Sequence, residues 1–453
     1  MPIAKNPPGP RGHFLTGHLP EFRKDMLGFV TRCAREFGDI TAIRLGPKRC
    51  LLINHPDLIE DVLVGNSRFY TKHFALRLNP ILLGKGLLTS EGGFWLRQRR
   101  LVQPAFQRSR IAAYGDVMVS YTQRMLSGWK DGETRDLHAE MMRLTLEIVA
   151  KTLFDADVAN DAGDVGDALE TSLFHFSAQF KSLIKLPMFI PTPGNIRLKQ
   201  AVKRLDTIIY RFIEQRRASG QDLGDLLSML LNARDEDDGR QMTDKQLRDE
   251  MMTLFLAGHE TTAITLAWTF YLMAGHPEAE NRLLEELRLV LGGRPPTVAD
   301  LPRLRYTDWI LMESMRLYPP AYMIGREPIQ TVRIGEYDVP KGTTVFMSQW
   351  VTHRDPRFFD DPDKFLPERW LSERSKKVPK YAYFPFGGGP RICVGSNFAM
   401  MEACLILAAV AQLWHFDLTP GHPVTPLPLM TLRPACGIKG TLTRRREEDK
   451  MMG

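Results

Sequence analysis

A glycine-rich segment surrounds the cysteine that is best placed for chemistry. Residues 386–395 read F-G-G-G-P-R-I-C-V-G, so Cys393 follows three consecutive glycines and Arg391. Glycines let a chain turn tightly and lie close to a flat ligand, because no Cβ atom intervenes. Backbone N–H groups in such a turn can donate to a thiolate, and the start of a following helix favours its negative charge. These features suit a thiolate bound to a metal, but taken alone they favour a buried cysteine that only packs, because most buried cysteines do.

A second group of polar residues interrupts a long apolar stretch, where residues 257–262 read A-G-H-E-T-T. Buried carboxylates and hydroxyls need hydrogen-bond partners, and a mid-helix glycine costs about 1 kcal/mol relative to alanine. We therefore expect something to approach the backbone at this point. The zinc-protease motif H-E-x-x-H is excluded, because Ala263 stands where its second histidine is required.

The elements that must position these residues follow from periodicity and capping. Thr243 and Gln246 have the spacing of a capping box, and apolar residues continue to Ala274. This predicts one long helix that is apolar nearly all round and therefore central and buried. The other expected elements are helices within 92–318 and at 396–414, a hairpin at 41–46 and 50–53, strands at 332–339 and 343–347 around a turn at 340–342, and an irregular segment at 352–392.

The composition is that of a soluble globular protein. Of 453 residues, 43% are hydrophobic and 25% charged, which excludes a disordered chain, a collagen-like fibre and a disulfide scaffold. The longest apolar stretch, 403–411, is about half of the roughly 18 residues that a membrane helix needs. The N-terminus is too proline-rich for a signal peptide. We therefore expect a cytoplasmic protein without a membrane anchor.

Charge and cysteine content narrow the function further. The net charge of +7 is spread along the chain without a basic stripe, so no nucleic-acid partner is expected. The five cysteines are widely spaced and form no C-x-x-C pair, which argues against a disulfide framework and a structural zinc site. There is no internal repeat and no Gly/Ser linker. We expect one catalytic domain over residues 1–443 and a charged, mobile tail at 444–453.

The segment around Cys393 closely resembles the haem-binding signature of the cytochrome P450 family, F-x-x-G-x-R-x-C-x-G. Other family motifs follow in the family's order: W-x-x-x-R at 95–99, A-G-x-E-T-T at 257–262, E-x-x-R at 313–316, and P-E-R-W at 367–370 in place of P-E-R-F. The resemblance covers residues 95–395. It implies a mainly α fold with small β-sheets (α+β), in which the long central helix crosses the haem.

The resemblance also assigns roles to individual residues. Cys393 would be the proximal ligand of the iron of haem b. Phe386 and Gly395 belong to the same haem-binding loop. Residues that would hold the haem propionates are Trp95, Arg99, Arg326 and Arg391.

Two further groups of residues carry roles in the family. Glu313 and Arg316 would bind Arg369 in a buried network that shapes the cysteine loop. Glu260 and Thr261 would lie on the distal side, where reaction with O₂ needs protons and the exclusion of water. For Thr261, a hydrogen bond to its own helix is the structural alternative.

The implied activity is that of a monooxygenase that inserts one oxygen atom from O₂ into a small lipophilic substrate. Fatty acids, terpenoids, carotenoids and steroids all remain open. The expected pocket is mostly apolar, with candidate lining residues Phe74, Leu82, Phe180, Phe255, Ala257, Met323 and Met430. Two alternatives stay open: a peroxide-driven or rearranging haem-thiolate enzyme, and a haem sensor or carrier without turnover.

Electrons are expected from a separate protein. Too few residues follow Cys393 for a flavin reductase, and no G-x-G-x-x-G fingerprint precedes a helix. In this family the donor is usually an acidic ferredoxin or flavodoxin served by its own reductase. Basic residues that would form the docking face are Arg108, Arg110, Arg374, Lys376, Lys377 and Lys380.

Overall fold

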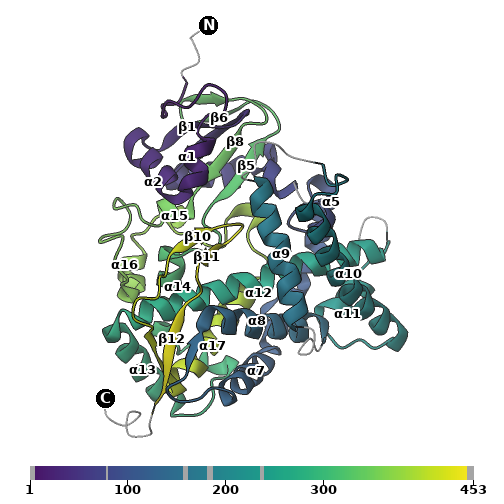
Figure 1. The fold of residues 1–453 in the computed structure, drawn as a ribbon, viewed down its shortest axis with the longest axis vertical. Coiled ribbons are helices and arrows are strands. Elements are labelled where there is room, and N and C mark those ends of the chain that lie inside the picture. Colours follow the sequence, from purple (N-terminus) through teal and green to yellow (C-terminus); the bar gives the residue numbers. More distant parts are fainter. Residues whose placement is uncertain (1–5, 78–79, 157–161, 181–186, 235–238, 446–453) are drawn as a thin grey trace.

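Helices form most of the chain, with small β-sheets around them (Figure 1). The computed structural model describes residues 6–77, 80–156, 162–180, 187–234 and 239–445. The helices are α1 (Leu19–Lys24), α2 (Met26–Phe37), α3 (Pro56–Glu60), α4 (Pro80–Leu83), α5 (Gly92–Val102), α6 (Arg108–Ala112), α7 (Gly115–Ser127), α8 (Leu137–Phe154), α9 (Ala162–Phe180), α10 (Pro193–Ser219), α11 (Leu226–Asn232), α12 (Asp244–Ala274), α13 (Pro277–Leu291), α14 (Arg305–Leu317), α15 (Gln349–Thr352), α16 (Ser372–Ser375) and α17 (Ser396–Leu413). The expected mainly α architecture with small sheets is confirmed.

The largest sheet lies at the end of the molecule nearest the N-terminus (Figure 1). Its strand order is β1 (Ile40–Leu45), β2 (Lys48–Ile53), β8 (Thr344–Met347), β5 (Ile324–Pro328) and β3 (Tyr70–Lys72). Only β2 and β8 run parallel. The smaller sheets are β4 (Thr134–Asp136) with β12 (Lys439–Arg444) and β9 (Trp414–Leu418), β10 (Pro426–Pro428) with β11 (Leu432–Pro434), and β6 (Val332–Ile334) with β7 (Tyr337–Val339).

The strand predictions are partly confirmed. The hairpin expected near residues 41–53 is present as β1 and β2, with Ile40 opposite Ile53. The stretch 332–339 is instead a hairpin of its own, because Gly335 turns the chain with a φ of 57°. The strand after the 340–342 turn is β8, and it pairs with β2 and β5.

Helix α12 is the predicted central helix, and its start is set by the expected capping box. The Thr243 hydroxyl accepts from the Gln246 N–H at 3.3 Å, while the Gln246 side chain accepts from the Thr243 N–H at 2.8 Å. The expected close approach at Gly258 is made by α8. A Cβ on Gly258 would lie only 3.1 Å from the side chain of Val149. The glycine therefore lets α8 and α12 pack closely.

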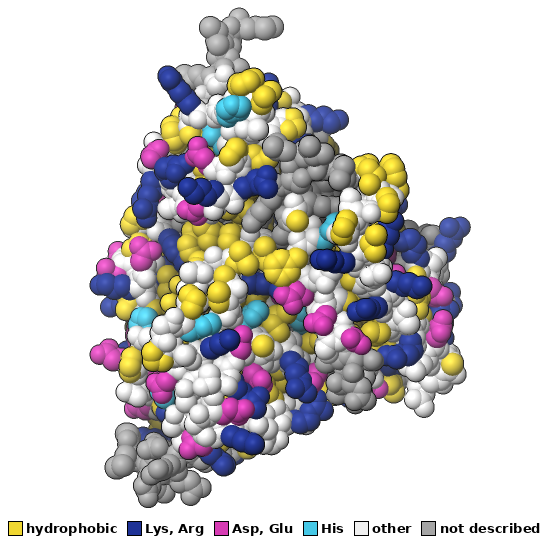
Figure 2. Space-filling view, in the orientation of Figure 1, with side chains coloured by type: hydrophobic (Ala, Val, Ile, Leu, Met, Phe, Trp, Pro, Cys, Tyr) yellow, Lys and Arg dark blue, Asp and Glu magenta, His cyan; other side chains and the backbone are white. Residues whose placement is uncertain are grey.

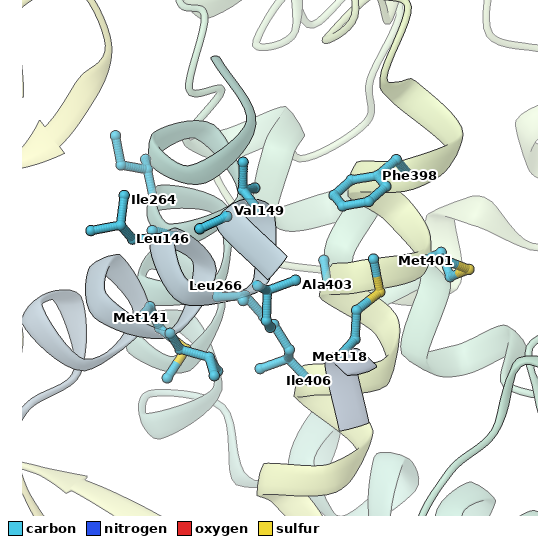
Figure 3. Close-up of a cluster of buried hydrophobic side chains, with 14 of the residues drawn as sticks. Met118, Met141, Leu146, Val149, Ile264, Leu266, Phe398, Met401, Ala403 and Ile406 are labelled. Carbon is cyan, nitrogen blue, oxygen red and sulfur yellow. The ribbon is translucent and has the colours of Figure 1, made fainter. Parts of the chain in front are cut away.

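Side chains from several helices form the core beside α12, part of which is drawn in Figure 3. Met118 of α7, Val149 of α8, Leu266 of α12 and Ile406 of α17 gather in one buried cluster. Helix α17 corrects one expectation from the sequence. Its range Ser396–Leu413 is long and apolar enough to cross a membrane, with a mean hydropathy of 1.5, but 67% of it is buried inside the protein. Its apolarity is explained by packing in this core.

Candidate active site

The loop that carries Cys393 packs against a neighbouring segment through its glycines. Gly387 and Gly389 have φ values of 73° and 66°, which other residues rarely adopt. A Cβ on Gly389 would lie 1.8 Å from the carbonyl oxygen of Leu63, so only glycine allows this contact. The N–H of Cys393 donates to the Phe386 carbonyl at 3.0 Å and closes the loop. The thiol is thus held in place just before α17.

The Cys393 side chain is exposed on one side and surrounded by protein on the others. Burial of the thiol raises its pKa, whereas the Gly395 N–H and the Arg99 guanidinium act in the opposite direction. Arg99 also donates to the Ile392 carbonyl at 2.8 Å. The structure therefore places Arg99 against the cysteine loop. Metal binding deprotonates a thiol, and these two groups favour the thiolate that results.

Cations gather around Trp95 of α5. The Arg391 guanidinium lies 4.7 Å from the centre of the Trp95 ring and the Lys72 ammonium 5.9 Å from it. Lys72 is directly opposite Arg326 in the β3–β5 pair. Burial, and then the charge of Arg391, lower the pKa of Lys72 to about 7 and that of Arg326 to about 10. Glu91 pairs with Arg391, and its carboxylate also accepts from the backbone N–H of Lys72.

This cluster fits the carboxylates of a haem. Like charges placed directly opposite each other on two strands are destabilising. An anion bound near Lys72 and Arg326 would offset their repulsion. Arg391 also indicates an anion site, because its Nη1 is buried without a partner among the described residues. Three cations gather here, where Glu91 pairs with Arg391 and the charge of Glu250 also acts on Lys72. The residues present therefore match a group that brings its own negative charges.

Glu313 joins α14 to the irregular segment below the cysteine loop. Its carboxylate accepts from Arg316 at 2.9 and 3.0 Å and from Arg369 at 3.3 Å. The indole N–H of Trp370 adds a bond of 3.0 Å and the Leu366 N–H one of 3.1 Å. Glu313 and Arg316 are fully buried. The structure thus brings together the three residues that the E-x-x-R and P-E-R-W motifs single out.

The middle of α12 has one accessible stripe on an otherwise buried helix. Ala257 is exposed and Gly258 and Thr261 are half-buried, whereas the stretches 247–256 and 262–270 are buried. Residues spaced four apart lie on one helix face, so Ala257 and Thr261 share this stripe. The Thr261 hydroxyl donates to the Ala257 carbonyl at 2.8 Å. Accessible space therefore reaches the centre of the molecule at Thr261.

Glu260 faces a different side of α12 from Thr261. Its carboxylate is 2% exposed and accepts from Arg433 and from Thr431, each at 2.6 Å. Both partners come from the chain at β11. His138 of α8 lies near this ion pair, and burial together with the charge of Arg433 lowers its pKa to about 4. The structure thus holds the carboxylate in a buried ion pair, one residue before the accessible threonine.

The seven pocket candidates are placed in different surroundings. Ala257 is on the accessible stripe, and Phe74, Met323 and Met430 are half-buried. Leu82 and Phe255 lie in the core, 1% and 5% exposed. The Phe255 ring packs 6.0 Å from that of Phe154. The side chain of Phe180 lies outside the described part of the chain.

Sequence reasoning did not single out several residues that the structure brings to the site. Glu91 and Arg433 pair with expected site residues, but each is far from its partner in the sequence. Glu402 is fully buried beside Thr262, and burial raises its pKa to about 8. A signal was available for Glu402, because it is the only charged residue in α17.

Comparisons with known proteins identify the relatives of this chain. The chain is 40% identical to "Cyclooctatin synthase" of Streptomyces melanosporofaciens, over 93% of this chain and 92% of that one. It is 38% identical to "Cyclooctat-9-en-7-ol 5-monooxygenase" of the same organism, over 90% and 88%. It is 36% identical to "Pentalenene oxygenase" of Streptomyces avermitilis, over 95% and 96%.

A solved structure and a family match complete the comparison. The crystal structure of the cytochrome P450DA haem domain superposes with a TM-score of 0.90 at 26% identity, and the match covers 99% of both chains. The description of the Cytochrome P450 family matches residues 7–439. The expected haem cofactor and oxygen-incorporating activity are confirmed by these relatives. The chain belongs to the cytochrome P450 family and is a haem-dependent monooxygenase.

Proposed function

We propose that this chain hydroxylates a cyclic terpenoid with electrons from a separate ferredoxin or flavodoxin. The observation that carries the proposal is the accessible stripe of Ala257, Gly258 and Thr261 on the buried helix α12. Its only side chains are a methyl group and a hydroxyl that is already bonded to its own helix. Such a surface suits the apolar face of the haem that this helix is expected to cross, with an apolar substrate beside it. The names of the three Streptomyces relatives support a terpenoid among lipophilic substrates.

The haem would be held from two directions. Cys393 would supply the thiolate ligand from a loop that Phe386 closes and Gly395 connects to α17. Trp95, Arg326 and Arg391, with Lys72, would bind the propionates. The bound haem supplies the activation of O₂, and thiolate ligation favours O–O cleavage in this family. Glu313, Arg316 and Arg369 would support the loop from below.

Thr261 would hold a proton donor at the accessible stripe and limit the entry of water. Glu260 would act as a proton relay behind it, taking a proton from water and passing it on, with Arg433 and Thr431 holding its carboxylate in place. The two residues are adjacent in sequence but face different partners. Proton transfer between them therefore needs either a rotation of the Glu260 side chain or an intervening water.

The electron donor would dock on basic residues of the described surface. Arg110, Arg374, Lys376, Lys377 and Lys380 are all exposed, and the side chain of Arg108 lies outside the described part. On the face shown in Figure 2, basic and acidic side chains are intermixed rather than gathered in one block. A steep loss of turnover with added salt would support electrostatic docking of an acidic partner. Salt-independent turnover would contradict it.

The substrate proposal is tested by titrating the purified ferric protein with terpenoids, fatty acids and steroids while the Soret band is recorded. Saturable loss of the axial water with cyclic terpenoids alone is the expected result. Product formation with that terpenoid and a ferredoxin system then tests hydroxylation. A response to fatty acids or steroids instead would overturn the substrate class. Turnover with peroxide but not with reduced ferredoxin would favour the peroxide-driven alternative.

We also propose that the protein works in the cytoplasm as a soluble enzyme. Helix α17 is the described helix with the length and composition of a membrane span, and it is needed in the core. Residues 1–443 are proposed as the catalytic unit, although residues 1–5 and 446–453 lie outside the described part.

A further inference from the structure

The segment 84–90, named here the clamp segment, lies directly on the N-terminal half of α12. A Cβ on Gly84 would meet the Asp249 carboxylate at 2.1 Å, and one on Gly86 would meet the Thr253 hydroxyl at 2.1 Å. The N–H of Lys85 donates to the Asp249 carboxylate at 2.9 Å. Two glycines and a carboxylate thus bring the backbone of the clamp segment into contact with the helix.

The peptide groups of Leu87 are held from both sides by buried charged residues. The Leu87 N–H donates to Oε2 of Glu250 at 2.9 Å, and the Leu87 carbonyl accepts from the Lys72 ammonium at 2.8 Å. The other oxygen of Glu250 accepts from the Gln98 amide of α5 at 2.8 Å. Glu250 is fully buried. One carboxyl group therefore joins α12, the clamp segment and the helix that carries Trp95.

The clamp segment borders the accessible stripe of α12. Gly86 contacts Thr253, and Ala257 and Thr261 follow Thr253 at steps of four residues on the same helix face. The described clamp residues are mostly half-buried. Leu87 and Leu88 are only partly buried against the core, and residues 84–90 form no helix or strand, so this segment opens more readily than the core helices. Opening of the clamp segment would widen the space beside Ala257.

The protonation of Glu250 is coupled to the position of the clamp segment. Burial raises its pKa to about 7, and the negative charge of Asp249 acts in the same direction, while the Leu87 N–H, Gln98 and the charge of Lys72 oppose it. Arg248 and Lys245 are further charged neighbours on α12, and both bind Asp249. A carboxyl group that gains water on opening returns toward its ordinary pKa of about 4.3. The closed arrangement therefore binds the proton more tightly, so lower pH favours closing and higher pH favours opening.

We propose that Glu250 is a positioning residue whose protonation state controls the opening of the clamp segment beside the substrate space on α12. The proposal rests on the proposed function, since it takes that space to be the site of a lipophilic substrate. The Glu250 carboxylate accepts from the Leu87 N–H and from the Gln98 amide. It acts through the Leu87 peptide and through Gln98.

Hydrogen exchange of the haem-loaded full chain tests the proposal directly. Exchange of a peptide covering residues 84–91 is measured at pH 6 and pH 8 by mass spectrometry and corrected for the intrinsic pH dependence. In the wild type, protection is expected to fall toward pH 8 by up to roughly tenfold. In Glu250→Gln the side chain cannot ionise, and Gln98 can turn its unpartnered oxygen toward the new amide. In this variant, protection of residues 84–91 is therefore expected not to show the fall between pH 6 and pH 8 that depends on Glu250.

Matched variants separate this role from a general loss of structure. Glu147→Gln makes the same change on α8, where Glu147 pairs with Arg124 and Arg143 away from the clamp segment. It should behave as the wild type. Glu250→Asp keeps the charge but shortens the reach, so protection of residues 84–91 should be low at both pH values. Lys72 titrates in all variants, so only the difference from Glu250→Gln reports on Glu250.

A ligand readout gives a second, independent measure. The rate at which clotrimazole shifts the Soret band is recorded for wild type and Glu250→Gln, and their ratio cancels the titration of the azole itself. The rate of the wild type divided by that of Glu250→Gln is expected to rise from pH 6 to pH 8. The same pH dependence in both proteins, in exchange and in azole binding, would overturn the proposal. Neither measurement uses a terpenoid or turnover, so failure here leaves the proposed substrate untouched, and failure of terpenoid turnover leaves the clamp result standing.

Discussion

The indole N–H of Trp370 donates to the Glu313 carboxylate at 3.0 Å, in a network where Arg316 and Arg369 already bind the same group. The related family motif has phenylalanine at this position, which has no such donor. Glu313 is fully buried, so each additional donor offsets part of the cost of removing its charge from water. In this chain the Glu313 carboxylate therefore accepts one more hydrogen bond than the family motif provides.

Replacing Trp370 with phenylalanine should destabilise the protein without preventing haem binding. The loss of one hydrogen bond to a buried charge is expected to lower the free energy of unfolding by about 1–2 kcal/mol. Urea unfolding of the haem-loaded protein measures the change, and the haem content per chain serves as the control. Unchanged stability would show that the indole bond contributes nothing to the network.

Glu313→Ala should give protein that cannot hold haem. The substitution leaves Arg316 and Arg369 as buried charges without their carboxylate, which costs several kcal/mol. The pyridine haemochrome assay on purified protein gives the haem content. Glu368→Ala is the matched control, because Glu368 lies in the same segment but pairs with Arg282 and Tyr306 instead. A normal haem content in Glu313→Ala would contradict the proposed role.

Arg326→Leu should have opposite effects on the apoprotein and on haem binding. Removing the charge opposite Lys72 relieves a cross-strand repulsion, so the apoprotein should melt at a higher temperature. The same change removes a proposed propionate partner, and haem should leave roughly tenfold faster, the equivalent of about 1.4 kcal/mol. Thermal unfolding and haem transfer to apomyoglobin measure the two effects. Arg333→Leu on the exposed strand β6 should change neither.

Thr261→Ala should consume reductant but release the electrons as hydrogen peroxide. Without the hydroxyl on the accessible stripe, proton delivery loses its control over water. The ratio of product and peroxide to NAD(P)H consumed is the measurement. Thr265→Ala is a suitable control, because that hydroxyl is buried and donates to the Thr261 carbonyl at 2.9 Å. Coupling equal to the wild type would remove Thr261 from the mechanism.

His138 should make the fold sensitive to acid. Its pKa is lowered to about 4 by burial and by the charge of Arg433, whereas an unfolded chain binds a proton at its ordinary pKa of about 6.5. The unfolded state thus binds more protons between these values, and stability falls as the pH drops from 6.5 to 4, by up to about 3 kcal/mol. His138→Gln should flatten urea-unfolding midpoints over this range. His13→Gln, on the exposed N-terminal segment, should keep the slope of the wild type.

Features coded by neighbouring residues could be predicted from the sequence. The capping box of Thr243 and Gln246 lies within one turn, so it defines the start of α12 without knowledge of the fold. The glycine positions around Cys393 are equally local. The i,i+3 spacing of Glu313 and Arg316 predicts their contact for the same reason.

Features that depend on distant segments could not be predicted from local patterns. The partner of Glu260 is Arg433, 173 residues away, and no spacing rule connects them. Leu82 and Phe255 are apolar and lie near the expected pocket in sequence, but apolar periodicity does not distinguish a pocket wall from the core. The hairpin at Gly335 was missed because a single glycine within a strand pattern admits both a bulge and a turn.

The Glu313 network also has a consequence for the order in which the protein is made. Glu313 and Arg316 leave the ribosome together, and Leu366 and Trp370 follow 53 and 57 residues after Glu313. Cys393 comes later still. Since domains are synthesised from the N-terminus, every partner of the Glu313 carboxylate is available before the cysteine emerges. The nascent chain can therefore complete this network before Cys393, the proposed iron ligand, has been translated.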